Sequence, residues 1–157
     1  MCPPHEVEII QATAEHLGVI RALFSEYANS LEIDLCFQNF QQELDGLPGA
    51  YAAPEGRLFV AGLPQGTGCV ALRPLQPGVC EMKRLYVRPA YRRTGLGRRL
   101  AITAVKAGRR LGYETMRLDT LASMTSAIAL YRSLGFNEIE PYYHNPSACA
   151  VFMEKKL

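Results

Sequence analysis

The chain has little of what most metal and disulfide sites require. It contains no tryptophan, three histidines and five cysteines in 157 residues. The cysteines are scattered, odd in number and without a CxxC pair, which argues against a disulfide framework or a zinc site and favours reduced thiols. The histidines (His5, His16 and His144) lack the spacing of metal ligands. We therefore expect no metal.

Long apolar runs are also missing, so no membrane-spanning helix and no membrane partner are expected. The first residues, Met-Cys-Pro-Pro-His-Glu, do not have the pattern of a secretory signal. An apolar fraction of 48% with 20% charged residues is typical of a globular protein. We expect a cytoplasmic protein in which residues 1–157 form one domain, because the chain is too short for two ordinary cores.

Positive charge is concentrated in one segment. The net charge is only +2, but residues 81–110 hold ten of the seventeen basic side chains and a single acid, Glu81. A local basic field on a nearly neutral protein favours a small polyanionic ligand over a long nucleic acid. For Arg98, Arg109 and Arg110, a solvated helix face is the competing interpretation.

Hydrophobic periodicity predicts the element order β-α-α-β-β-β-α-β-α-β-β. The predicted strands cover 6–12, 57–63, 69–75, 79–87, 115–121, 136–142 and 148–155; the predicted helices cover 14–31, 37–44, 95–111 and 124–134. The strand–helix–strand unit from 79 to 121 requires a parallel crossover inside an otherwise antiparallel sheet. The predicted fold class is α/β (α+β), a mixed, twisted sheet of about seven strands flanked by about four helices.

The segment with the clearest chemistry is Arg92-Arg-Thr-Gly-Leu-Gly-Arg-Arg-Leu100, between a predicted strand and a predicted helix. Backbone N–H groups at a helix start, surrounded by arginines, suit phosphate oxygens. The Rossmann fingerprint does not fit, because Leu100 replaces its third small residue. A Walker loop does not fit either, because Gly97 is followed by Arg98 and not by lysine.

This motif, Arg92-x-x-Gly-x-Gly97, is preceded by Leu85-Tyr-Val-Arg-Pro89 and followed by Leu130-Tyr-Arg-Ser-Leu-Gly-Phe136. With these neighbours the chain resembles the GNAT superfamily of acetyl-CoA-dependent N-acetyltransferases, over essentially its whole length. The resemblance implies that acetyl-CoA donates an acetyl group directly to a primary amine of a small molecule or peptide. It does not imply which amine.

The same resemblance implies that the strands at 79–87 and 115–121 splay apart and that the pantetheine arm of the cofactor lies along the first of them. The Val87 amide would then polarise the thioester oxygen. Many relatives carry an asparagine where this chain has Met124, so either a nearby hydroxyl such as Ser126 replaces that contact or the contact is absent. The other residues expected to bind acetyl-CoA are Leu85, Tyr86, Arg92, Arg93, Thr94, Gly95, Leu96, Gly97 and Arg98.

Amine acetylation needs two proton movements. An alkyl ammonium with a pKa of about 10 must lose a proton before it attacks, and the departing thiolate benefits from a proton donor. Tyr131 matches the family tyrosine beside the CoA sulfur and is expected to be the general acid; its competing role is that of a packed aromatic. Glu81 is expected to be the general base, directly or through water, and its competing role is an ion pair with Lys83 or an arginine.

In this fold the acceptor enters opposite CoA, between the loop after the first helix and the final strands. Carboxylates and aromatic rings there suit a cationic amine. The acids of that loop have an ordinary surface role as their alternative, and His144 has a structural or solvated one. The residues expected to bind the acceptor are Tyr27, Glu32, Phe37, Tyr143 and His144.

Two other functions compete with transfer. A non-catalytic acyl-CoA-binding or regulatory module is compatible with Met124 but not with the retained Tyr131 and Glu81. Nucleic-acid binding through the arginines is disfavoured, because the aromatic residues do not interleave with them. Edges of the final strands often pair in this fold, so a homodimer is also among the expectations.

Overall fold

A computed structural model describes residues 6–31 and 39–157. These residues contain seven strands, four α-helices and short 3-10 turns at Ala14–His16, Gly49–Tyr51 and Pro89–Tyr91. The α-helices are α1 (Leu17–Ser30), α2 (Phe40–Asp45), α3 (Leu96–Arg110) and α4 (Thr125–Ser133). The strands are β1 (Ile9–Gln11), β2 (Arg57–Ala61), β3 (Gly68–Gln76), β4 (Val79–Val87), β5 (Thr115–Leu121), β6 (Asn137–Ile139) and β7 (Ala150–Lys156).

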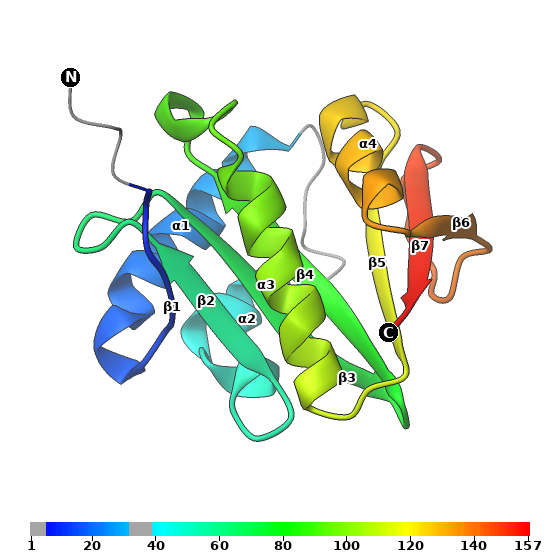
Figure 1. Ribbon diagram of the computed structural model, residues 1–157, viewed down its shortest axis with the longest axis horizontal. Helices are drawn as coiled ribbons and strands as arrows, with labels where there is room; N and C mark the ends of the chain where they lie inside the picture. The colour runs from blue at the N-terminus through cyan, green and yellow to red at the C-terminus, as the bar shows by residue number, and fades with distance from the viewer. Residues whose placement is uncertain (1–5, 32–38) are drawn as a thin grey trace.

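The strands form one sheet in the order β1-β2-β3-β4-β5-β7-β6 (Figure 1). All neighbours are antiparallel except β4 and β5, which are parallel and connected through α3. The predicted fold class, with its mixed sheet and its single parallel crossover, is therefore confirmed. In the described part of the chain, no helix is both long and apolar enough to cross a bilayer.

The sheet has an apolar core on each face. Leu100 and Ala104 of α3 pack with Met116, Leu118 and Phe136 on one face, where Tyr131 of α4 also lies. Residues of α1 and of the segment after α2 contribute to the second core on the other face, among them Ile20, Leu23, Phe24, Leu47 and Tyr51. A sheet covered on both sides needs strands that are apolar on both sides, and the unbroken buried run 68–72 of β3 meets that need.

The predicted elements differ from the observed ones mainly at their ends. The strand predicted at 136–142 is shorter and covers only Asn137–Ile139, because Tyr142 turns inward from a loop and donates a hydrogen bond to Glu81. The first predicted helix begins with a 3-10 turn at Ala14–His16. Of the helix predicted at 37–44, the described part begins at Phe40.

The strands β4 and β5 diverge, and this divergence creates the space for a site. They are paired only from Val79 to Glu81 on one side and from Thr115 to Arg117 on the other. Further along, β4 is irregular: Arg84 has a φ of 60°, and the register with β3 shifts between Cys69 and Ala71. A bulge of this kind bends a strand, so the carboxyl ends of β4 and β5 separate. The splaying that the family resemblance implied is present.

Candidate active site

Three cavities follow the gap between β4 and β5. The outer groove, of about 480 Å³, is lined by residues 85–87 of β4, Arg92 and residues 123–127 at the start of α4. It shares Leu85, Met124 and Ala127 with a central cavity of about 70 Å³, which is also lined by Tyr131. The central cavity in turn shares Lys83 and Arg84 with a polar pocket of about 330 Å³. The three cavities therefore form a row in which each shares lining residues with the next, and this row is called the cleft below.

The glycine turn lies at the outer end of this cleft. Arg93 and Gly95 take left-handed backbone conformations, with φ of 64° and 85°. The N–H of Arg99 donates to the Gly95 carbonyl at 3.1 Å, so the amides of residues 96–98 precede the first helical hydrogen bond. A turn of alternating hand followed by a helix start directs several N–H groups toward one point, which is the geometry of an anion site.

The turn also leaves space that the protein does not fill. A Cβ added at Gly95 would meet nothing within 4 Å, and one at Gly97 would come no closer than 3.8 Å to Val87 Cγ2. Packing against the rest of the protein therefore does not require glycine at either position. An approaching ligand would require it at Gly97, where the backbone is helical.

The arginine side chains near the turn point in different directions. Arg92 donates through Nε to the Val87 carbonyl at 3.0 Å, and its guanidinium lies 5.8 Å from the centre of the Tyr86 ring. Arg98 extends to α4 and donates to Ser133 Oγ at 2.8 Å. The feature these residues share at the outer groove is therefore the backbone, and not a cluster of guanidinium groups.

Two further residues of the turn contribute through the backbone. Leu96 is only 3% exposed and belongs to the core under α3, so its side chain is not available to a ligand. Thr94 donates its hydroxyl proton to the Tyr91 carbonyl at 2.6 Å. Both side chains hold the turn in place and leave the amides to face outward.

Tyr131 lines the central cavity. It is 8% exposed, and its ring packs edge-on against Phe136 with 5.8 Å between centroids. The described part of the chain gives its hydroxyl no hydrogen-bond partner. Burial raises the pKa of Tyr131, so the phenol keeps its proton at neutral pH and can donate it.

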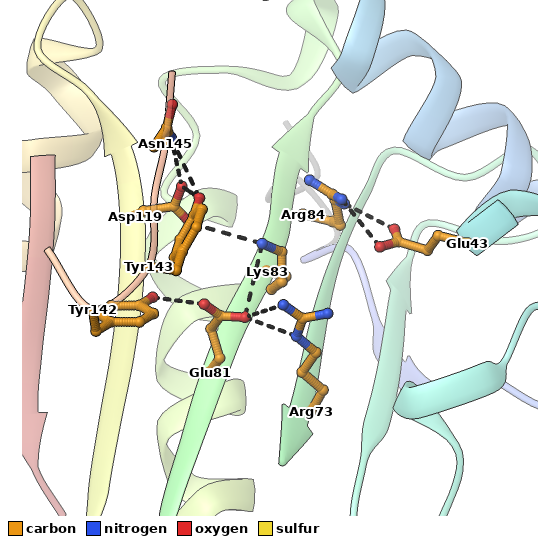
Figure 2. A network of polar contacts seen from close by, with 9 residues as sticks. All are labelled: Glu43, Arg73, Glu81, Lys83, Arg84, Asp119, Tyr142, Tyr143 and Asn145. Carbon is orange, nitrogen blue, oxygen red and sulfur yellow. Dashed lines mark hydrogen bonds and ion pairs between the residues drawn. The ribbon is translucent and has the colours of Figure 1, made fainter. Parts of the chain in front are cut away.

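Glu81 is fully buried at the inner end of the cleft (Figure 2). Its Oε1 accepts from Arg73 Nε and Nη2, both at 2.7 Å, and Lys83 Nζ lies 3.8 Å away. Its Oε2 accepts the hydroxyl proton of Tyr142 at 2.6 Å. Burial raises the pKa of Glu81, but Lys83, Arg73 and the Tyr142 hydrogen bond together lower it below its usual value. The group is therefore a carboxylate at neutral pH.

Asp119 of β5 forms the second acidic centre of this network (Figure 2). Its Oδ2 accepts hydrogen bonds from the Tyr143 hydroxyl and, at 3.4 Å, from Asn145 Nδ2. Its Oδ1 lies 3.7 Å from Lys83 Nζ, so Lys83 stands between two carboxylates. Burial lowers the pKa of Lys83, although Glu81 and Asp119 act in the opposite direction.

The expected acceptor residues are distributed unevenly. Tyr27 lines the outer groove and the central cavity, and Tyr143 lines the polar pocket. His144 is exposed and does not belong to the residues lining the three cavities. Glu32 and Phe37 lie outside the described residues.

Several residues of the network were missed by the sequence reasoning. Arg73 and Asp119 were read only as parts of strands, and Tyr142 was placed near the acceptor but not connected with Glu81. A usable signal existed for Arg73, because a charged residue that follows an apolar run within a strand needs a partner. The contact between Tyr142 and Glu81 had no local signal, since 61 residues separate the two.

Comparison with known proteins gives a consistent result. The acetyltransferase (GNAT) family profile matches residues 19–136. An uncharacterized N-acetyltransferase of Schizosaccharomyces pombe is 42% identical over 146 residues, covering 91% of this chain and 90% of that protein. An uncharacterized N-acetyltransferase of Escherichia coli, YjgM, is 32% identical over 126 residues, covering 78% of this chain and 74% of that protein. The chain belongs to the GNAT family of acetyltransferases.

Solved structures agree on the fold. A GNAT-family acetyltransferase of Staphylococcus aureus superposes with a TM-score of 0.78 at 21% identity, covering 96% of this chain and 98% of that one. A putative acyl-CoA N-acyltransferase of Klebsiella pneumoniae gives a TM-score of 0.72 at 27% identity, covering 97% and 98%. Members of this family generally use an acyl-CoA co-substrate. Within residues 6–31 and 39–157, no group of three or more metal-ligating side chains is present.

Proposed function

We propose that this chain moves the acetyl group of acetyl-CoA directly to a primary amine of a small molecule or peptide. The observation that most supports this is the row of neighbouring cavities along the diverging strands β4 and β5. One end of the cleft has the geometry of an anion site, the middle holds a buried phenol, and the other end holds ionised side chains. A donor and an acceptor can therefore reach one point from opposite ends.

The residues of the outer groove fit the cofactor. The amides of residues 92–97 are proposed to hold the pyrophosphate, with open space above Gly95 and Gly97 for its oxygens. Residues 85–87 are proposed to pair with the pantetheine arm, and the Val87 amide to polarise the thioester carbonyl. Ser126 lines the groove together with Ser123 and Thr125, so hydroxyls are available where Met124 replaces the family asparagine. Acetyl-CoA, when bound, supplies the activated acetyl group.

The proton movements are assigned to two residues. Tyr131 is proposed to donate its phenolic proton to the departing CoA thiolate and to regain one from water. Glu81 is proposed to receive the ammonium proton through water in the polar pocket, since its Oε2 accepts a hydrogen bond from Tyr142 and can accept a second. Its lowered pKa makes it a weak base, so the proton passes on to solvent.

The test combines binding with turnover. Acetyl-CoA is expected to raise the melting temperature by several degrees at a concentration well above its Kd. Incubation with a panel of amines and peptides is then expected to release free thiol. Stabilisation without thiol release for any acceptor would favour the non-catalytic acyl-CoA-binding module.

Tyr131→Phe tests the general acid. The ring and its packing on Phe136 are kept, so stabilisation by acetyl-CoA should be unchanged while kcat falls about 100-fold or more. Tyr113→Phe is the matched control, because its hydroxyl bonds the Glu55 carbonyl at 2.8 Å outside the residues lining the cleft. An unchanged kcat in Tyr131→Phe would remove this residue as the acid.

A further inference from the structure

Among the described residues, the charged side chains at the polar pocket balance. Its lining includes Arg73, Lys83 and Arg84 against Glu43 and Glu81, and Asp119, whose Oδ1 lies 3.7 Å from Lys83 Nζ, supplies the third negative charge. Arg84 holds Glu43 in a bidentate pair, with Nε–Oε2 of 2.9 Å and Nη2–Oε1 of 3.0 Å. Arg73 and Tyr142 together engage both oxygens of Glu81 (Figure 2). Every carboxylate oxygen that lines this pocket therefore already has a hydrogen-bond donor.

The donors of the pocket, in contrast, exceed its acceptors. The Lys83 side chain is 4% exposed, and its Nζ lies 3.8 Å from Glu81 and 3.7 Å from Asp119, both longer than a hydrogen bond. Arg73 directs Nε and Nη2 to the same oxygen of Glu81, and residues 6–31 and 39–157 provide no hydrogen-bond partner for its Nη1. A buried ammonium with three N–H groups and no short hydrogen bond is costly unless another acceptor approaches it.

We infer that the acceptor amine carries an oxyanion, and that Lys83 and Arg73 bind it. This inference rests on the transfer function proposed above and names the substrate class for the same site. An oxyanion would supply the acceptors that Lys83 and Arg73 lack. A second ammonium group, as in a polyamine, would add further donors where donors already exceed acceptors.

The position of Lys83 also limits the size of the acceptor. Lys83 lines the polar pocket and the central cavity, and Tyr131 lines the same central cavity. A group held by Lys83 is therefore close to the place where the acetyl group is transferred. The oxyanion and the reactive amine must be separated by few bonds, so the substrate class is a small amine of the amino-acid type.

Matched substrates test this inference on the unaltered protein. Each amino acid of a panel is compared with its carboxamide and with its decarboxylated amine, and β-alanine is compared with 2-aminoethylphosphonate and propylamine. We expect kcat/KM to be at least about tenfold higher for the anionic member of each set. A phosphonate preference would identify the oxyanion as a phosphonate and a carboxylate preference as a carboxylate. Equal or better use of the neutral members would overturn the inference.

The binding measurement separates this inference from the transfer proposal. In the presence of CoA, the anionic member of each pair should raise the melting temperature more than its carboxamide, whether or not turnover occurs. Thiol release that is equal for neutral and anionic amines would leave the transfer function standing and defeat the oxyanion. Selective stabilisation by the anionic members without any thiol release would support the oxyanion and defeat the transfer function.

The substitution Lys83→Met then tests whether Lys83 binds the oxyanion of the acceptor. It keeps the length of the side chain and removes the charge, so KM for the anionic amine should rise about tenfold or more and the preference over the carboxamide should disappear. Lys83→Arg should retain part of the preference. Lys106→Met, on the exposed face of α3, is the control for the substitution itself. A full preference in Lys83→Met with normal stabilisation by acetyl-CoA would exclude Lys83 as the anion-binding residue.

Discussion

The two ends of the cleft are formed by different parts of the protein, the backbone at one end and side chains at the other. At the outer groove, the main feature is the backbone of one short turn, while the neighbouring arginines are engaged elsewhere. At the polar pocket, the main feature is a set of buried side chains from β3, β4, β5, α2 and the loop after β6 (Figure 2). A backbone site tolerates many sequences, so it can serve a whole family with one donor. A side-chain site is specific to the chain that builds it.

The contrast predicts a different response to mutation at each end. Removing a side chain at the outer groove should change little, because the amides remain. Removing one at the polar pocket should leave a buried charge without its partner, which is expensive in a low-dielectric interior. The following substitutions address that contrast, beginning with the largest expected effect.

Glu81→Ala should be the most damaging of these substitutions. It leaves Arg73 and Lys83 without the carboxylate that they share, so the free energy of unfolding should fall by about 3–5 kcal/mol. Urea denaturation measures the loss. Glu138→Ala is the matched control, because Glu138 is 61% exposed and 3.8 Å from Arg132; there we expect a change within about 0.5 kcal/mol. Similar losses in the two variants would mean that the network adds no stability.

Gly95→Ala should lower the free energy of unfolding less than Glu81→Ala does, and it should specifically weaken the binding of acetyl-CoA. With φ at 85°, an alanine costs about 1–2 kcal/mol, although its Cβ meets nothing within 4 Å. If the turn shifts to relieve this strain, its N–H groups no longer point toward one position, and most of the stabilisation by acetyl-CoA should disappear. Gly112→Ala is the matched control: its φ is 89°, its surroundings are equally open, and it ends α3 at the other end. Equal stabilisation of both variants by acetyl-CoA would place the pyrophosphate elsewhere.

The same contrast explains how much the sequence could predict. The glycine turn, the helix after it and the parallel crossover are encoded by residues within about forty positions of each other, and all three were predicted. The strand β5 was placed at its observed bounds, because apolar and polar residues alternate along it. Tyr131 was placed in a helix over 124–134 by the hydrophobic periodicity, and its place beside the cofactor sulfur was expected from the family resemblance.

The polar pocket could not be predicted in this way. The contact of Tyr142 with Glu81 joins a loop to a strand, and it replaces the end of the strand predicted at 136–142. The pairing of Arg84 with Glu43 depends on the left-handed conformation of Arg84 in β4, which no residue-type preference indicates for an arginine. Side-chain networks between distant segments follow from the packed fold, so they become visible only once the fold is known.

The smallest expected effect is that of pH on the protein, because Tyr131 and Glu81 should both keep their protonation states across the neutral range. The pKa of Tyr131 is raised above its ordinary value of about 10, so the proposed acid stays protonated across the neutral and moderately alkaline range. The pKa of Glu81 is lowered below its ordinary value of about 4.3, so the proposed base stays ionised down to mildly acidic pH. Neither residue should therefore change its charge between about pH 6 and pH 9. The rise of kcat/KM in that range should follow deprotonation of the amine alone, at about tenfold per pH unit below the amine pKa.

Two amines with different pKa values make this measurement decisive. The midpoint of the profile should move with the pKa of the amine, because the free amine is the reactive form. A midpoint that stays fixed when the amine is changed would show that a group of the protein titrates instead. In that case the buried lysine between Glu81 and Asp119 is the first group to examine, since burial lowers the pKa of Lys83. The profile of Lys83→Met would then lose its midpoint, and the inner end of the cleft would bind the acceptor and also set the pH at which it reacts.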